Sequence, residues 1–304
     1  MRSCGISSTC GTFSIVAADL EAGEVGCAVE SKYFSVGSVV PWAAAGVGAV
    51  ATQAAGVAVY GRRALEELAR GASPDEALER VLDGDEGRET RQLGVVGADG
   101  RAAAFTGREC LDWAGHRVGA GFAVQGNILA GEAVVAAMEH AFEKTVGPLV
   151  ERLVAALEAG QSAGGDRRGQ QSAAVVVERV GARSESREGI DRICDLRVED
   201  HPEPIAELRR LVGIWTSWDA ARRAYRLAEE GRHTEAAGAM RRALDRDPDD
   251  AMTLYNLACF ESLAGAREDA LAHLRRSVAL DPSYRELAAS DRDFDPIRDS
   301  LSGL

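Results

Sequence analysis

Two short apolar runs on either side of a turn occupy residues 12–31. Phe13, Ile15 and Val16 belong to the first run and residues 25–29 to the second, with "DLEAGE" between them. Apolar runs of this length around a connection that contains Asp and Gly are typical of a β-hairpin. The chain is therefore expected to begin its first domain with a hairpin, and a hairpin needs further strands or helices to cover its apolar faces.

Thr12 stands at the head of this hairpin, directly after Gly11. If the bond between them were cut, Thr12 would become a chain terminus with a hydroxyl as nucleophile and a new α-amino group as the adjacent base. One residue would then supply both groups that covalent amide hydrolysis requires. The alternative is that Thr12 is an ordinary strand residue whose hydroxyl caps backbone groups.

The length and composition of the chain limit its class and its partners. Its 304 residues suffice for about two domains, with 46% hydrophobic and 27% charged residues as in a soluble protein. No apolar run approaches the roughly 18 residues of a membrane helix. A formal charge of -13 disfavours a nucleic-acid partner, because phosphate binding needs clustered basic surface. Neither a membrane nor a nucleic acid is thus an expected partner.

The six cysteines lie far apart and include no C-x-x-C pair, so they predict no metal site and no disulfide framework. They favour a reducing cytoplasm, and no cofactor is predicted. Residues 1–11 lack the apolar core of a signal peptide and are interpreted as a short leader. Within this leader, Cys10 is a second candidate nucleophile, and Cys4 is taken as a leader residue.

The order of predicted elements after the hairpin indicates an α+β fold. Strand pairs are predicted within residues 35–55, 91–107 and 170–201, and amphipathic helices within 59–82 and 131–161. Strands and helices thus come in groups, which suits layers rather than strict alternation. Two sheets packed face to face between helical layers would satisfy this order.

Six blocks of the sequence resemble, in the same order, a bacterial family called domain of unknown function 1028, which in turn resembles the N-terminal-nucleophile (Ntn) hydrolases. The similarity extends from about Thr12 to Leu211. It implies a four-layer αββα sandwich over residues 12–212 and an amide hydrolase whose nucleophile is a chain terminus. The blocks are "TFSIVAAD", "GEVGCAVESKYFSVGSVVPWAAAGVGAVATQA", "AAFTG", "WAGHRVGAGFAVQGNILAG", "GGDRRGQQSAAVVV" and "DLRVEDHPEPIAELRRL".

The same resemblance suggests residues that support the nucleophile. Asp166 and Ser172 are similar in placement to the late aspartate and serine that support the terminal amine in proteasome-type enzymes, although their spacing is longer here. The catalytic lysine of proteasome β subunits, which precedes a Gly-rich turn, has no counterpart in "SVGSVVPWAAAG". This difference argues against a mechanism identical to the proteasome's.

Two further residues are candidates because they end predicted strands. Lys32 follows the second strand, where an ammonium would favour the neutral, basic form of a Thr12 amine. Its alternative role is that of a solvated lysine. Asn127 lies in a predicted turn, residues 125–127, that leads from a strand into a helix. Its amide would hold a developing oxyanion, or it would cap that helix.

Three residues are candidates for substrate binding. Arg167 and Arg168 form an adjacent pair whose guanidinium groups match the geometry of a substrate carboxylate, with a solvated loop as the alternative. His116 lies in the glycine-rich segment "WAGHRVG" beside Trp113. It is interpreted as a substrate contact or proton donor, the alternative being a structural histidine.

Residues 213–304 contain an internal repeat of 34 residues, the period of tetratricopeptide repeats. The tryptophan usual near the start of such a repeat is absent at Ala220 and Leu254. Residues 284–301 are expected to form a polar capping helix. The matching pairs are Gly231/Gly265, Ala236/Ala270, Met240/Leu274, Ala243/Ser277, Asp247/Asp281 and Pro248/Pro282.

The repeat segment is expected to bind a peptide or protein partner, or a second copy of the chain in a homo-oligomer. It is rich in arginine although the chain is acidic, which favours an acidic partner, unless these residues are only solvated helix surface. The residues are Arg222, Arg223, Arg226, Arg241, Arg242, Arg275 and Arg276.

Two functions remain open at this level. The first is an Ntn-type amidohydrolase that acts on a small amide or peptide-like substrate, its Thr12 exposed either by self-processing before Thr12 or because the start codon is misassigned. The second is a catalytically silent scaffold that binds partners through its repeats.

Overall fold

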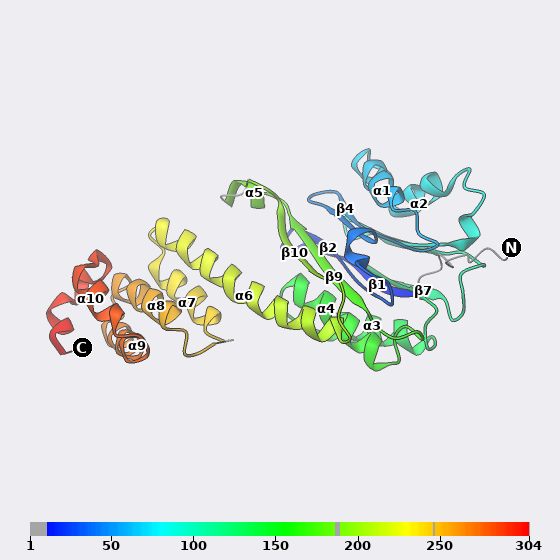
Figure 1. Cartoon of the computed structure of the whole chain (residues 1–304). Coiled ribbons are helices and arrows are strands. Elements are labelled where there is room, and N and C mark those ends of the chain that lie inside the picture. Colours follow the sequence, from blue (N-terminus) through cyan, green and yellow to red (C-terminus); the bar gives the residue numbers. More distant parts are fainter. Residues whose placement is uncertain (1–10, 186–188, 246, 304) are drawn as a thin grey trace. The chain divides into compact units, whose positions relative to one another are not determined.

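A computed structural model describes residues 11–185, 189–245 and 247–303 of the chain. Of the predicted leader only Gly11 falls within these ranges, so Cys4 and Cys10 lie outside the described residues. The chain divides into two compact units between Val212 and Gly213. The first contains two antiparallel sheets and helices, and the second is entirely helical, which confirms the predicted α+β class (Figure 1).

The larger sheet has six strands in the order β10-β9-β2-β1-β8-β7. Its centre is the predicted hairpin, in which Thr12 pairs with Ser31 and Asp19 with Glu24. The turn closes because the Asp19 carboxylate accepts two backbone N–H groups and Gly23 adopts a positive φ. The strands are β1 Thr12–Asp19, β2 Glu24–Ser31, β7 Gly115–Gly119, β8 Phe122–Asn127, β9 Ser172–Arg179 and β10 Arg192–Val198.

The smaller sheet has four strands in the order β3-β4-β5-β6. Helices α1 (Val59–Ala69) and α2 (Pro74–Leu82) pack their apolar faces against it, with Ala64, Leu78 and Val81 in the shared core. Ser73 and Glu76 form the reciprocal capping box that starts α2. The strands are β3 Pro41–Ala44, β4 Gly48–Ala54, β5 Arg91–Gly97 and β6 Ala102–Thr106.

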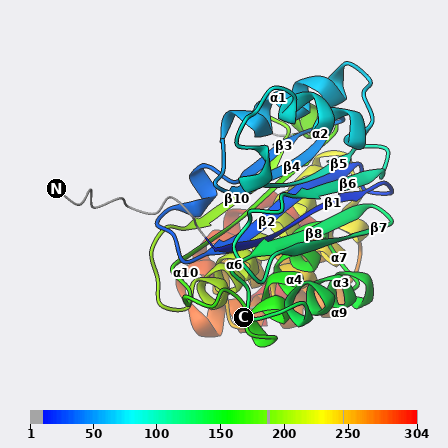
Figure 2. The same cartoon turned by 90° about the vertical axis from the view of Figure 1, so that its right-hand side faces the viewer.

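The two sheets face each other, and helices α3 (Ala133–Lys144) and α4 (Leu149–Ser162) cover the far side of the larger one (Figures 1 and 2). Side chains alternate along β1 as a strand requires. Phe13 lies against the helices, close to Gly160, whereas Val16 belongs to the apolar core between the sheets. Thr12 has the parity of Val16 and therefore points between the sheets.

The short elements of the first unit lie in its connections. They are the 3-10 helices Val36–Ser38 and Arg88–Thr90 and the one-turn helix α5 (Ala182–Glu185). Helix α6 (Pro204–Glu229) begins in this unit, where Ile205, Leu208 and Val212 are buried, and continues past the division at Gly213.

Two helices of the second unit begin 34 residues apart, at His233 and at Arg267. Helices α7 (His233–Ala243) and α9 (Arg267–Leu280) occupy equivalent places, and α8 (Ala251–Leu263) lies between them in sequence. The matched pairs Ala236/Ala270 and Met240/Leu274 are all fully buried. Both repeat glycines, Gly231 and Gly265, have a positive φ directly after a helix, a conformation that favours glycine.

The predicted capping helix at residues 284–301 is α10 (Ser283–Ser290) followed by a 3-10 segment, Arg292–Gly303. Phe294 and Ile297 of that segment are buried against α8 and α9 with Tyr255 and Leu274. Within the described residues, no helix is long and apolar enough to cross a membrane.

Candidate functional site

Thr12 begins β1 between two neighbouring strands, paired with Ser31 on β2 and with Asn127 on β8. Thr12 as a whole is 1% exposed to solvent. β1 is a central strand that begins at Thr12, so the Gly11–Thr12 peptide bond lies just before the strand while the threonine is held on both sides. A reacting group at this place is therefore positioned by the sheet itself.

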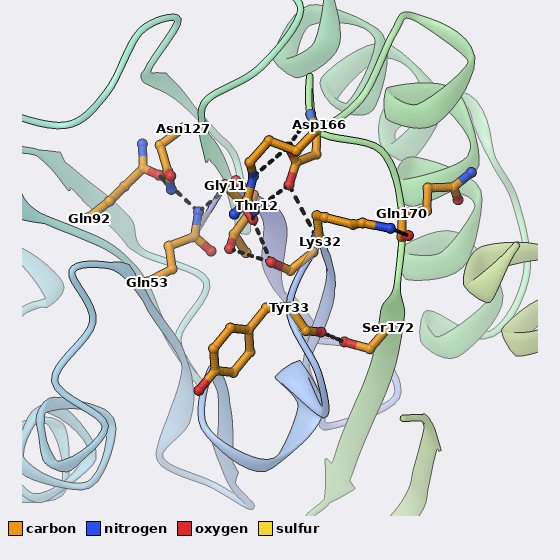
Figure 3. Close-up of polar contacts among 12 residues, drawn as sticks. Gly11, Thr12, Lys32, Tyr33, Gln53, Gln92, Asn127, Asp166, Gln170 and Ser172 are labelled. Carbon is orange, nitrogen blue, oxygen red and sulfur yellow. Dashed lines mark hydrogen bonds and ion pairs between the residues drawn. The ribbon is translucent and has the colours of Figure 1, made fainter. Parts of the chain in front are cut away.

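A short chain of hydrogen bonds joins the Thr12 hydroxyl to the carbonyl of Gly11 (Figure 3). The Thr12 hydroxyl donates to Ser31 Oγ over 3.0 Å, and the Ser31 hydroxyl donates to Gly11 O over 2.5 Å. Arg168 Nη2 donates to the same carbonyl oxygen over 2.7 Å. The Gly11 carbonyl thus has two donors, one of them charged.

Asp166 lies beside Gly11 and organises this end of the sheet (Figure 3). Its carboxylate accepts from the Lys32 backbone N–H at 3.1 Å and the Arg168 backbone N–H at 2.9 Å. It also pairs with the Arg168 guanidinium at 2.7 Å. The side chain is 0% exposed. Positive φ values at Gly165 and Gly169 let the loop fold back around it.

Lys32 contributes to the site through its backbone rather than its ammonium. Its Nζ donates to the carbonyl of Gln170 over 2.9 Å, and Figure 3 shows the side chain extended away from Thr12. Ser172 also contacts a neighbouring segment rather than Thr12: its hydroxyl donates to Tyr33 O and accepts from Val36 N. Asp166 therefore lies beside the Gly11–Thr12 bond. The Lys32 ammonium and the Ser172 hydroxyl instead make their hydrogen bonds to Gln170 and to residues 33–36.

Asn127 is not in a turn or a helix cap, and that part of the sequence-based prediction is wrong. It is the last residue of β8, and residue Glu132 occupies the N-cap of α3. The strand extends farther than predicted because each of its residues pairs with β1. The Asn127 amide donates to Gln92 Oε1 over 2.9 Å in the buried space between the sheets.

That space contains a network of amide side chains that sequence analysis missed. Gln53 on β4 donates to Gln92 Oε1 over 2.9 Å and approaches the Thr12 carbonyl at 3.4 Å. Gln53 Oε1 accepts a hydrogen bond from the Ser14 hydroxyl, and the oxygen of that hydroxyl accepts one from Gln125 Nε2. The available signal was a glutamine inside three apolar strands, Gln53 in β4, Gln92 in β5 and Gln125 in β8, since a buried polar group needs partners.

His116 and Arg167 lie apart from Gly11. His116 Nδ1 is 2.8 Å from the hydroxyl of Thr106, which accepts from Gln92. The residue is exposed, yet neighbouring protein partly desolvates its ring and lowers its pKa. Arg167 donates to the carbonyl of Asp112 over 3.2 Å. Of the three predicted substrate-binding residues, only Arg168 reaches the Gly11 carbonyl.

Glu30 adds a buried acid behind the site. It is fully buried on β2, one residue before Ser31. Burial, and secondarily the negative charge of Asp166, raise its pKa well above the ordinary range, against the opposing effect of Arg168. Its neutral form is favoured, so Asp166 is the carboxylate that offsets the Arg168 charge.

A group suited to a metal ion occurs among the described residues only in the second unit. Cys259, Asp291 and Asp293 have ligand atoms within 4.8 Å of one another. The Tyr255 hydroxyl and the Asp293 N–H already donate to the Asp291 carboxylate. Hydrogen bonds within the protein account for this cluster.

The arrangement at Gly11 and Thr12 fits acyl transfer. A hydroxyl lies next to an amide carbonyl whose oxygen receives two preorganised donors, and such donors stabilise the oxyanion of a tetrahedral intermediate. Ser31 links the hydroxyl and the oxygen, so it can move a proton between them. Sequence analysis had named Thr12, Asp166 and Arg168 but had not identified Ser31.

Comparison with known proteins identifies the family of this chain and a solved structure that is similar to it. The model of a family described as "Family of unknown function (DUF1028)" matches residues 12–208. The crystal structure of protein SPO2555 from Silicibacter pomeroyi, whose title names the same family, is similar with a TM-score of 0.60 and 34% identity. The match covers 66% of this chain and 88% of that one. No curated protein matches the chain.

Proposed function

The chain belongs to the DUF1028 family, and we propose that it is an amide-bond hydrolase of the Ntn type, which cleaves its own Gly11–Thr12 bond and then acts on a small amide or peptide-like substrate. One observation carries the proposal. The Gly11 carbonyl oxygen accepts hydrogen bonds from Ser31 Oγ and Arg168 Nη2, while the Thr12 hydroxyl donates to Ser31.

The self-cleavage step follows from these contacts. Thr12 Oγ attacks the carbonyl carbon of Gly11, its proton is transferred to the nitrogen of Thr12, and Ser31 remains a donor to the Gly11 oxygen. A carbon–oxygen bond forms, the carbon–nitrogen bond breaks, and the product is an ester with a free α-amine. Water then hydrolyses the ester, which releases residues 1–11 as a carboxylic acid. The negative charge on the Gly11 oxygen is stabilised by Arg168 and Ser31, and one such donor contributes about 10²–10³ in rate.

The cut is also what the proposed amidase activity requires. Thr12 is 1% exposed in the uncut chain, which leaves its hydroxyl out of reach of a substrate. Removal of residues 1–11 would vacate the acyl side of the site and create the amine that serves as base. The layer order supports the same superfamily, because two facing sheets lie between the helix pairs α1–α2 and α3–α4 (Figure 2).

The decisive experiment is the intact mass of the purified recombinant chain, followed over time. We expect loss of the mass of residues 1–11 and an N-terminal Thr12 in sequencing of the product. A chain that keeps its full mass under all conditions would contradict self-processing.

The second candidate is a binding scaffold without catalysis, favoured by the helical unit. The equivalent burial of Ala236/Ala270 and Met240/Leu274 supports a tetratricopeptide-type module, which would take an acidic peptide, a protein partner or a second copy of this chain. An uncut chain in the mass experiment would favour this function.

The arginines of that unit are less available to a partner than the sequence implied. Arg241 lies 2.5 Å from Glu261, a carboxylate that is 0% exposed, and Arg276 pairs with Asp249. His273 also contacts Glu261, at 2.7 Å. Arg241, Arg242, Arg275 and Arg276 are all exposed. An acidic partner would reach Arg242 and Arg275 first, since neither is engaged with Glu261 or Asp249.

Arg241→Ala should destabilise the second unit, because the buried Glu261 carboxylate would lose its arginine partner and keep only the contact with His273. The expected loss is about 1.5–3 kcal/mol of unfolding free energy. Arg276→Ala is the matched control, since Asp249 is 64% exposed and such pairs contribute about 0–1 kcal/mol. Chemical denaturation followed by helical circular dichroism measures both. Equal stability of the two variants would refute the structural role of Arg241.

A further inference from the structure

Glu30 is a buried carboxyl group that the self-cleavage step does not use. The residue is 0% exposed, and among the described residues neither of its carboxyl oxygens has a hydrogen-bond partner. The backbone N–H of Gln171 lies close enough to lower its pKa, but outside hydrogen-bond geometry. Buried polar groups are nearly always hydrogen-bonded, because an unpaired one costs free energy. An unpaired acid beside a proposed reaction site is therefore a candidate for a functional role.

The β1–β2 register places Glu30 on the same face of the larger sheet as Asp166. Glu30 pairs with Phe13, whose side chain lies against the helices close to Gly160. Directly paired side chains project to the same face, and so does Gly11, two residues before Phe13. A β-carbon built on Gly11 would lie 2.7 Å from Asp166 Oδ2. Glu30 and Asp166 thus both lie on the helix side of the sheet, at the end where the cleavage site is.

The groups around Glu30 determine which of its two forms is stable. Burial and the negative charge of Asp166 raise its pKa well above the ordinary range, whereas Arg168, the Gln171 N–H and Lys32 act in the opposite direction. Two charged residues of the covering helix α4, Arg152 and Glu158, pair elsewhere, with Asp19 and Arg209. Two nearby carboxyl groups cannot both ionise at low cost, so Glu30 is the one that keeps its proton. The neighbouring residues are Phe13 on β1, Ala173 on β9, Lys32 after β2, and Asp166, Arg168 and Gln171 in the loop before β9.

Arg168 connects this pair of acids to the reaction site. Its Nη2 lies 2.7 Å from both the Gly11 carbonyl oxygen and Asp166 Oδ2. Asp166 holds the guanidinium rigidly, because its carboxylate is itself fixed by the backbone N–H groups of Lys32 and Arg168. With Glu30 neutral, Asp166 alone offsets the charge of Arg168, and Nη2 donates to the Gly11 oxygen. An ionised Glu30 would attract the same guanidinium and would repel the negative charge that develops on that oxygen.

We propose that Glu30 is a positioning residue for self-cleavage: as a neutral acid behind the Gly11–Thr12 bond it leaves the Arg168 guanidinium to the Gly11 oxygen, and its ionisation at high pH withdraws that support. This role rests on the proposed self-cleavage. It makes the rate depend on a proton that takes no part in breaking the bond.

The test compares self-cleavage of the wild-type chain and Glu30→Gln from about pH 5, just above the ordinary pKa of Glu, to about pH 9.5. Freshly translated chain is shifted to each pH, and its intact mass is followed over time. Glutamine has nearly the same shape and cannot ionise, so the ratio of the two rates isolates the charge of Glu30. We expect the rate of Glu30→Gln relative to wild type to rise at least about tenfold across this range, because one donor to an oxyanion contributes about 10²–10³ in rate.

Glu24→Gln is the matched control, because it makes the same substitution at the opposite end of β2. Its rate relative to wild type should stay constant with pH. If Glu30→Gln does not fold, Glu30→Met replaces it, since methionine has a similar length and no charge, and the same rise is expected.

Stability gives a second measurement that does not require cleavage. An acid whose pKa is raised by folding destabilises the fold as the pH rises from the ordinary pKa to the raised one, and glutamine has no such dependence. In a Thr12→Ala chain, which stays uncut, Glu30→Gln should therefore gain stability relative to Glu30 as the pH rises. Urea denaturation at each pH measures this difference.

The outcomes separate this inference from the function beneath it. A rate ratio that stays constant with pH, in chains that do cleave, would overturn the positioning role and leave self-cleavage standing. A stability difference that is independent of pH would overturn it as well, since Glu30 would then not hold its proton. If neither wild type nor Glu30→Gln is cut at any pH, self-cleavage and the positioning role fall together.

Discussion

Thr12→Ala is expected to leave the chain uncut and without amidase activity while its fold persists. The substitution removes the only atom assigned to attack the Gly11 carbonyl, so no residual self-cleavage is expected. The structural cost is the hydrogen bond from Thr12 to Ser31, worth about 1 kcal/mol. For a domain of this size that corresponds to a fall of roughly 2–4 °C in Tm.

Thr12→Ser is the matched control, because it keeps a hydroxyl at the same position and should retain cleavage. Intact mass and turnover over an amide panel are measured for both variants, with Tm recorded beside them. Full cleavage or undiminished turnover in the Ala variant would refute Thr12 as nucleophile. An Ala variant with a collapsed Tm would instead show that Thr12 is mainly structural.

Asp166→Ala should give the largest loss of stability among the site variants. It removes a fully buried carboxylate and leaves the Lys32 and Arg168 backbone N–H groups and the Arg168 guanidinium without their acceptor. Breaking a buried pair costs about 3–5 kcal/mol. Arg168 is 32% exposed and regains some solvation, so a value of about 3 kcal/mol is expected.

The measurement is urea denaturation of Asp166→Ala beside Arg62→Ala, which removes an exposed pair with Glu66 on α1. The control should change by about 0.5 kcal/mol or less. A loss at Asp166 no larger than this would mean that the loop around Gly11 stands without the carboxylate. In that case the rigidity ascribed to Asp166 would be withdrawn.

The parts of the site that could be predicted are those encoded locally. The hairpin followed from two apolar runs and its turn, and Thr12 followed from its place at the strand's start. Asp166 and Arg168 were named from a short loop motif and its resemblance to a family. None of these needed knowledge of which strands face each other.

The rest depends on pairing across the sheet and between the sheets. Ser31 matters because the β1–β2 register places it opposite Thr12, and sequence alone does not fix which of two alternating positions faces inward. Asn127 was predicted to lie in a turn because it follows a glycine and precedes a helix, a pattern that is common where a strand ends. The direction of the Lys32 ammonium, toward Gln170, follows from a loop 138 residues away.

The second unit shows the same limit. The 34-residue spacing of its matching residues agrees with the interval between the starts of α7 and α9, whereas the tetratricopeptide assignment stays a prediction. The partners of its arginines could not be predicted from the sequence. Arg241 donates to Glu261 on the next helix, and Arg276 donates to Asp249 in a loop. Charge counted along the sequence therefore overstates the cationic surface.

The buried amides between the sheets have a consequence for how the first unit can move. Burial of apolar surface is non-directional, whereas a hydrogen bond is lost when its partners are displaced by an ångström or two. Gln53 and Gln92 on the smaller sheet bind Ser14, Asn127 and the Gly126 carbonyl on the larger one. These hydrogen bonds permit one alignment of the two sheets, so β1 is held in place in the way that the proposed removal of residues 1–11 would require.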